Sequence, residues 1–148
     1  MKKTKQLSVG DPSTNVDLGA IVSKSHMNKI LQYIDYNVFI SKENIKGVVF
    51  FSGDRHFAEI HKLNYPNLSY PLYDFTTSPL SSPRHHLFFI EEKKNVKTRV
   101  PGSFYSNKNF LKCIVENVNN IDILKFQYKN KNGKIVFQQS LSEYDLGY

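Results

Sequence analysis

The fold class is decided by the segment Gly47-Val-Val-Phe-Phe-Ser-Gly-Asp-Arg-His-Phe-Ala-Glu-Ile60. It begins with a continuous apolar run of strand length, which suits a strand covered on both faces, as in the middle of a sheet in a layered α/β protein. In open sheets of that class, ligands bind beyond the carboxyl ends of the strands. The segment therefore predicts an α/β fold with a binding site directly after Gly53.

Two side chains with metal-binding chemistry follow Gly53. Asp54 and His56 are two positions apart, so in an extended conformation both side chains point to the same side. A carboxylate and an imidazole that converge on one point can bind a first-row metal ion. Residues of these types at strand ends also cap turns, so the pair by itself leaves both interpretations open.

The flanking pattern predicts a helix before this strand and mixed structure after it. Apolar residues at helical spacing predict a helix near 24–37. Short segments at 57–60 and 71–77 precede a loop at 78–83, and the charged stretch 91–98 predicts an exposed loop.

The C-terminal third has a β pattern. Strands are expected at 109–116, 122–128 and 134–139, and in the second of these apolar and polar residues alternate. Lys131-Asn132-Gly133 has the composition of a tight turn, so the last two strands are predicted to form an antiparallel hairpin.

Composition limits the function classes. A chain of 148 residues with 40% hydrophobic content is enough for one folded domain. The net charge is +7, but the lysines are scattered, so no nucleic-acid partner is predicted. No apolar stretch is long enough for a membrane span, and the basic start lacks the apolar region of a signal peptide, so a cytoplasmic location is expected for the chain as written.

Cys113 is the only cysteine, which excludes an intramolecular disulfide. It stands in an apolar run of strand type, and we therefore expect a buried, unreactive thiol.

Several motifs resemble one enzyme family in the same order. The segment 47–60 resembles the last metal-binding motif of PhoD-like (alkaline phosphatase D) metallophosphoesterases, in which an apolar strand leads into Ser-Gly-Asp-x-His. Tyr70-Pro-Leu-Tyr-Asp-Phe-Thr-Thr-Ser-Pro-Leu80 is similar to a second family segment, and Arg99-Val-Pro-Gly102, Asn109-Phe110 and the terminal hairpin resemble the closing strands. The resemblance spans about 36–146. It implies the C-terminal portion of a calcineurin-like β-sandwich with flanking helices.

The resemblance also implies chemistry. In that family two metal ions bind a phosphate monoester or diester and activate a water molecule. It implies that His56 is a metal ligand and that Asp54 is a second ligand or orients one. Arg55 either faces the substrate phosphate or is a solvated surface arginine. The metals would be iron, calcium, manganese or zinc.

Other polar residues of the matching region receive structural interpretations. Thr76, Thr77 and Ser78 are expected to position their loop by hydroxyl bonds to the backbone. His61 is expected at the surface, and the adjacent His85 and His86 are not expected to share a metal.

Most of the family's metal ligands are missing. The early Asp-x-His, the Asn-His pair and the other upstream motifs do not occur in this sequence. We therefore expect an incomplete metal site and little or no phosphatase activity, and whether the chain is an enzyme stays open. If the strand at 48–51 has lost its neighbours, its open apolar edge is expected to cause self-association.

The N-terminus has a different resemblance. Residues 9–34 resemble a short structural segment of aldehyde dehydrogenases, with Ala20 in place of the usual proline, and the catalytic residues of those enzymes are absent. This divides the chain into an N-terminal segment, 1–35, and a partial PhoD-like domain, 36–148. Alternatively, that resemblance is accidental and 26–40 is the helix before the metal-motif strand.

Three functions remain open from the sequence: a truncated PhoD-like phosphoesterase, a non-catalytic β-rich binding or structural module, and an aldehyde dehydrogenase-related fragment.

Overall fold

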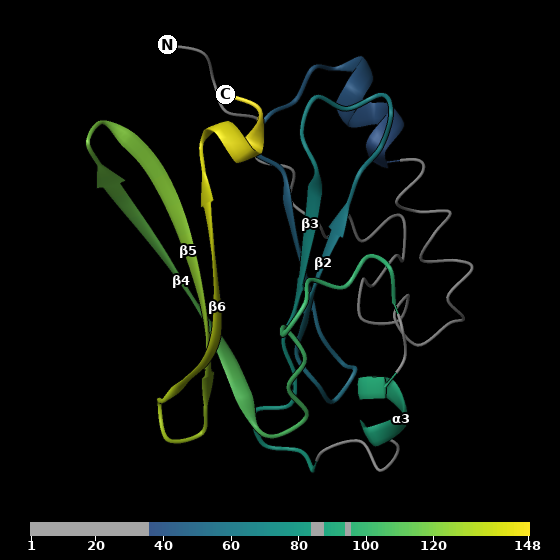
Figure 1. Cartoon of the computed structure of the whole chain (residues 1–148), viewed down its shortest axis with the longest axis vertical. Helices are drawn as coiled ribbons and strands as arrows, with labels where there is room; N and C mark the ends of the chain where they lie inside the picture. The colour runs from purple at the N-terminus through teal and green to yellow at the C-terminus, as the bar shows by residue number, and fades with distance from the viewer. Residues whose placement is uncertain (1–35, 84–87, 94–95) are drawn as a thin grey trace, which may run out of the picture.

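The computed structural model of the chain describes residues 36–83, 88–93 and 96–148 (Figure 1). Residues 36–42 are helical. The elements that follow are β1 (Val49–Ser52), β2 (Glu59–Leu63), β3 (Leu72–Thr76), α3 (Phe88–Lys93), β4 (Asn109–Val118), β5 (Ile121–Asn130), β6 (Ile135–Ser142) and the 3-10 helix η1 (Tyr144–Leu146). The described chain is mostly β with little helix, which confirms the predicted class only as a β-rich α/β arrangement.

The first sheet has the strand order β1-β3-β2. β1 runs parallel to β3, with Phe51 opposite Phe75, and β2 runs antiparallel to β3. The predicted strand therefore exists, and its side chains pack on both faces of the sheet. Its predicted place in the middle of a sheet is wrong for the described residues, because β3 takes that position.

The second sheet, β4-β5-β6, is antiparallel throughout and contains the predicted hairpin. The turn between β5 and β6 needs a residue in the left-handed region, and Gly133 supplies it with a φ of 80°. The Asn130 side chain accepts hydrogen bonds from the backbone N–H groups of Asn132 and Lys134 at 3.0 and 3.1 Å. These bonds fix the turn and the register of the hairpin.

The two sheets pack face to face around aromatic side chains. The rings of Phe75 in β3 and Phe126 in β5 stack with centroids 3.9 Å apart, and both residues are fully buried. Burying an aromatic side chain of this size contributes about 1.5–3 kcal/mol to stability. The contact joins the first sheet to the second at their centre.

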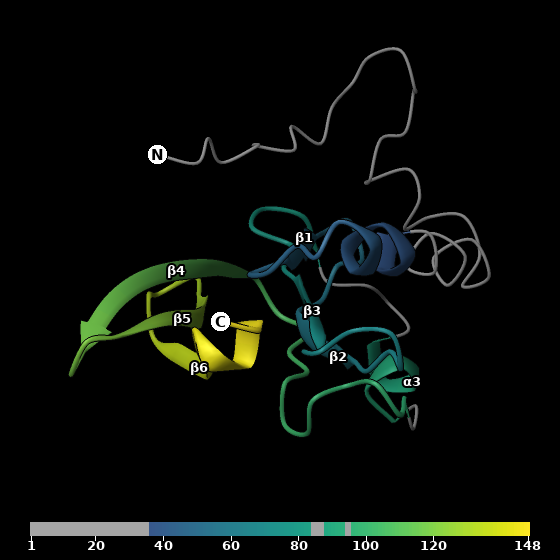
Figure 2. The same ribbon diagram turned by 90° about the horizontal axis from the view of Figure 1, so that it is seen from above.

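The helix at 36–42 covers the opposite face of the first sheet. Ile40 of the helix packs against Leu72 of β3 and Tyr70 in a second buried cluster. Both views show helix 36–42 and α3 on the side of the first sheet that faces away from β4, β5 and β6 (Figures 1 and 2). The described layers are therefore helix, sheet and sheet. Within the described residues, no helix is long and apolar enough to cross a membrane.

Two predicted boundaries are wrong. The helix that the structure describes ends at 42 and not at 37, because Ile40 packs over the sheet. The loop expected at 91–98 begins inside α3, which ends at Lys93. Residues 1–35 lie outside the described part, and with them the aldehyde dehydrogenase-like segment 9–34, most of the predicted helix 24–37 and the boundary at 35.

Cys113 is exposed, which corrects the prediction of a buried thiol. It lies in β4 opposite the buried Phe126 of β5, but β4 is at the end of its sheet. The inward-facing side of this strand is therefore incompletely covered, as the 71% exposure of Val115 shows. Partial burial still raises the pKa of the thiol, which makes Cys113 a poor nucleophile.

Candidate functional site

The segment 53–58 follows β1 at the end of the sheet where β3 also ends. Because β1 and β3 are parallel, their carboxyl ends lie together, and the Thr77 N–H donates to the Ser52 carbonyl at 2.9 Å. The segments after β1 and β3 approach each other so closely that a Cβ on Gly53 would lie 3.3 Å from the Thr77 carbonyl oxygen. A larger residue at position 53 would therefore need the neighbouring backbone to shift by a few tenths of an ångström, which favours the small residue that the sequence places there.

Asp54 and His56 do not have the extended backbone that the sequence interpretation assumed. Their φ angles are 63° and 59°, in the left-handed region that residues with a side chain rarely adopt. The chain has to turn sharply after β1 to enter β2, and two left-handed residues make that turn. Such conformations cost about 1–3 kcal/mol each and are concentrated at functional sites.

The His56 ring is oriented by a backbone carbonyl. Its Nδ1 lies 2.9 Å from the oxygen of Pro83. A carbonyl oxygen only accepts, so Nδ1 carries the proton, and in the neutral ring the lone pair is on Nε2. Histidines that bind metals are commonly held in this way, with the second nitrogen donating to a carbonyl or carboxylate.

The main chain of His56 is held by the loop after β3. Its N–H donates to the Ser78 hydroxyl at 3.3 Å. The predicted role of Ser78 as a hydroxyl that bonds to the backbone is thus confirmed. Thr76 and Thr77 differ, since their hydroxyls contact side chains: Thr76 meets Ser52 at 2.7 Å, and Thr77 donates to Asn109 at 2.9 Å.

Asn109 ties this loop to the second sheet. It is the first residue of β4 and is 1% exposed. Its side-chain amide donates to the Ser78 carbonyl at 2.6 Å, while its backbone N–H donates to the Pro79 carbonyl at 2.8 Å. The position of His56 therefore depends, through Ser78, on a buried amide more than fifty residues further along the chain.

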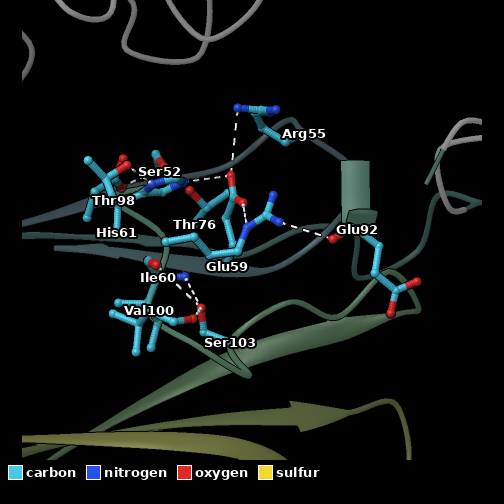
Figure 3. A network of polar contacts seen from close by, with 12 residues as sticks. Ser52, Arg55, Glu59, Ile60, His61, Thr76, Glu92, Thr98, Val100 and Ser103 are labelled. Carbon is cyan, nitrogen blue, oxygen red and sulfur yellow. Dashed lines mark hydrogen bonds and ion pairs between the residues drawn. The ribbon is translucent and has the colours of Figure 1, made fainter. Parts of the chain in front are cut away.

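Glu59 is a buried carboxylate surrounded by cationic side chains (Figure 3). Its Oε2 accepts from Arg99 Nε at 2.9 Å, and its Oε1 lies 3.7 Å from Arg55 Nη1. His61 Nε2 is 2.9 Å from Oε1, although the ring N–H is not aligned as in a regular hydrogen bond. Burial alone would raise the pKa of Glu59, but His61, Arg55 and Arg99 together lower it to about 2.

This network changes the interpretation of two predicted residues. The side chain of His61 is only 13% exposed, so the prediction that it lies at the surface is wrong. His61 lies in β2 with Glu59, and its Nδ1 is 2.9 Å from the Thr98 hydroxyl. Arg55 is partly buried, and its guanidinium lies 4.6 Å above the Phe57 ring. Arg55 is therefore held by its neighbours beside His56.

A second buried carboxylate lies in the middle of β3, beside the last residue of β1. Asp74 is fully buried and accepts a hydrogen bond of 2.8 Å from the Ser52 hydroxyl. Since Ser52 donates its proton to Asp74, the hydroxyl of Thr76 donates to Ser52. Sequence reasoning did not single out Glu59 or Asp74, although the alternation in β2 and β3 places both acids on the face away from the second sheet.

The described residues do not by themselves fit a metal centre. No group of three or more His, Cys, Asp or Glu side chains in that part of the chain could hold a metal ion. His56 offers one ring nitrogen, and Asp54 is exposed at the same turn. The remaining predicted histidines, His85 and His86, lie outside the described residues.

Comparisons with family models, with the curated proteins and with solved structures found no match to this chain.

Proposed function

We propose that residues 36–146 are the C-terminal part of a PhoD-like metallophosphoesterase, with His56 as a metal ligand. The observation that carries the proposal is the orientation of His56 at the carboxyl ends of β1 and β3, with Nδ1 bonded to the Pro83 carbonyl. That contact leaves the Nε2 lone pair for a ligand. The proposal is also supported by the contact between the two segments that resemble the family, because the His56 N–H of the first donates to the Ser78 hydroxyl of the second.

The proposed roles follow from the contacts. His56 would hold one metal through Nε2, and the exposed carboxylate of Asp54 at the same turn would be a further ligand or would orient one. Arg55, held by Glu59 and packed on Phe57, would bring the positive charge of its guanidinium close to a phosphate oxygen. In the complete family site, two metal ions would neutralise the charge that develops on the phosphate and activate water.

The chain alone should be inactive. A two-metal phosphoesterase site needs many more donors than His56 and Asp54, and the described residues bring no third His, Cys, Asp or Glu to them. Any bound metal would therefore be weakly held and would lack the second ion needed for in-line displacement.

The tautomer of His56 gives a test that does not depend on activity. In NMR spectra of the ¹⁵N-labelled chain at neutral pH, we expect neutral His56 as the Nδ1–H form, with Zn²⁺ shifting the Nε2 resonance. Replacement His56→Ala should abolish the Zn²⁺ response, whereas Glu43→Gln, which removes an exposed carboxylate after the helix, should leave it unchanged. A Zn²⁺ response that persists in His56→Ala would refute the assignment.

Activity provides the second test. Hydrolysis of an aryl phosphate monoester and diester is measured with added iron, calcium, manganese or zinc, and we expect no metal-dependent turnover. Turnover that disappears in His56→Ala would show that the chain assembles a working site, and the proposed incompleteness would then be wrong.

The alternative function is a non-catalytic, β-rich binding or structural module. It is favoured by the hydrophobic core that joins the two sheets, and among the described residues no third His, Cys, Asp or Glu joins His56 and Asp54. A module of this kind should have the same stability and ligand binding in the presence and absence of a chelator. A metal-dependent change in either property would favour the phosphoesterase proposal.

A further inference from the structure

A cleft of about 380 Å³ lies between the start of β4 and the turn that joins β5 to β6. Its volume is within the range of small-molecule sites. Its walls consist of one phenol, three amides and two ammonium groups, from Tyr105, Asn107, Asn130, Asn132, Lys108 and Lys131. None of the described residues that line the cleft is a carboxylate, so its electrostatic character is positive.

The amide of Asn130 is arranged as a donor. Its side-chain oxygen already accepts from the backbone N–H groups of Asn132 and Lys134. The NH₂ group therefore remains to contact a ligand. Backbone bonds between Asn130 and Lys134 and between Gly133 and Asn130, each 2.9 Å, make this wall rigid.

The opposite wall is also fixed by hydrogen bonds. The Asn107 carbonyl accepts from the buried Asn109 side chain at 2.8 Å, and Tyr105 exchanges backbone hydrogen bonds with Ala58 at 2.7 and 2.9 Å. Tyr105 is partly buried against the core, so its ring offers an apolar surface beside the polar groups. The cleft therefore exists before any ligand arrives.

The two lysines have no ion-pair partner in the described part of the chain. Lys108 and Lys131 are both exposed and come from opposite walls. Two ammonium groups without a nearby carboxylate repel each other and attract a doubly charged anion. Two ammonium groups and an amide NH₂ suit the several acceptor oxygens of a phosphate group.

We propose that this cleft binds a small organic phosphate, with the phosphate between Lys108 and Lys131 and the organic part against Tyr105. The cleft uses none of the residues assigned to the metal site, and its ligand needs no metal ion. The inference therefore goes beyond the proposed phosphoesterase function and does not depend on it.

The test is an NMR titration of the whole chain with glycerol phosphate in the presence of a chelator, which removes any contribution from a metal at His56. We expect saturable shifts of the side-chain amides of Asn107, Asn130 and Asn132. The double replacement Lys108→Gln and Lys131→Gln should weaken binding at least about tenfold, as expected for the loss of two charge-assisted contacts.

The matched control is Lys97→Gln with Lys112→Gln, which removes the same charge from exposed positions that do not line the cleft. The proposal requires this control to bind as tightly as the wild type. An equal loss of affinity in both double variants, shifts that do not saturate, or equal binding of citrate would overturn it. Competition with inorganic phosphate shows whether the cleft recognises the phosphate group alone or an organic phosphate. If inorganic phosphate binds more weakly than glycerol phosphate, the role of Tyr105 is supported, and if the two bind equally, that role is refuted.

Discussion

Replacing Glu59 by glutamine removes the carboxylate that pairs with Arg55 and Arg99 and lies beside His61 inside the protein. The Glu59 side chain is 2% exposed, and its pKa falls from 4.5 to about 2 on folding. At about 1.4 kcal/mol per pH unit, this fall corresponds to about 3 kcal/mol of stability at neutral pH. We expect Glu59→Gln to lower the free energy of unfolding by about that amount, since it also leaves buried cations without their partner.

The pH dependence has a defined sign. Because the folded pKa of Glu59 lies below its unfolded value, the stabilisation is complete above the unfolded pKa of 4.5 and is lost as the pH falls towards 2. The stability difference between wild type and Glu59→Gln should therefore shrink across that window.

The assay is urea unfolding followed by tyrosine fluorescence, which suits a chain with nine tyrosines and no tryptophan. The control is Glu116→Gln, which breaks an ion pair of 2.6 Å with Lys125 whose two side chains are 36% and 26% exposed. Exposed pairs of this kind contribute about 0–1 kcal/mol. Equal losses in Glu59→Gln and Glu116→Gln at neutral pH, or a loss that does not depend on pH, would refute the reasoning.

Two further predictions concern the support of His56 and the uncovered side of β4. Asn109→Ala should lower the free energy of unfolding by about 1–3 kcal/mol, because it leaves buried groups near Ser78 without hydrogen-bond partners. It should also weaken the Zn²⁺ response of His56, which is bonded to Ser78. Thermal unfolding measures the first effect and NMR the second, and an unchanged His56 spectrum would contradict the proposed coupling. Val115 is 71% exposed in β4, which is an end strand of the second sheet, so Val115→Lys should reduce self-association through β4, a surface separate from the edge of β1. The change in stability should be less than about 0.5 kcal/mol, and light scattering and urea unfolding measure the two effects. A wild-type chain that is a monodisperse monomer would contradict the second prediction.

The sequence predicted elements that are determined by local pattern. The hairpin was visible because apolar and polar residues alternate through β5 and because Gly133 occupies a position that needs a positive φ. β1 was visible as an apolar run followed by Ser52 and Gly53. Its place at the end of the described sheet was not visible, because strand order depends on pairing between distant segments.

The site was only partly predictable for the same reason. The sequence indicated His56 and Asp54, but not the left-handed backbone that turns them. The contacts that orient His56 come from Ser78 and Pro83, which are more than twenty residues away. Glu59 has an ordinary sequence context, and its buried charge network depends on Arg99, which only the folded chain brings to it.

The topology of the two sheets has a consequence for the order of folding. Each strand of the second sheet pairs with its neighbour in sequence, so β5 and β6 can meet after closing only a short loop. The parallel pair of β1 and β3 forms only after the chain has passed through β2 and returned, which costs more loop entropy. The second sheet should therefore form first, and the first sheet and the His56 turn should then form against it. In pulsed hydrogen exchange during refolding, the amides of β5 and β6 should gain protection before those of β1, and the reverse order would contradict this sequence of events.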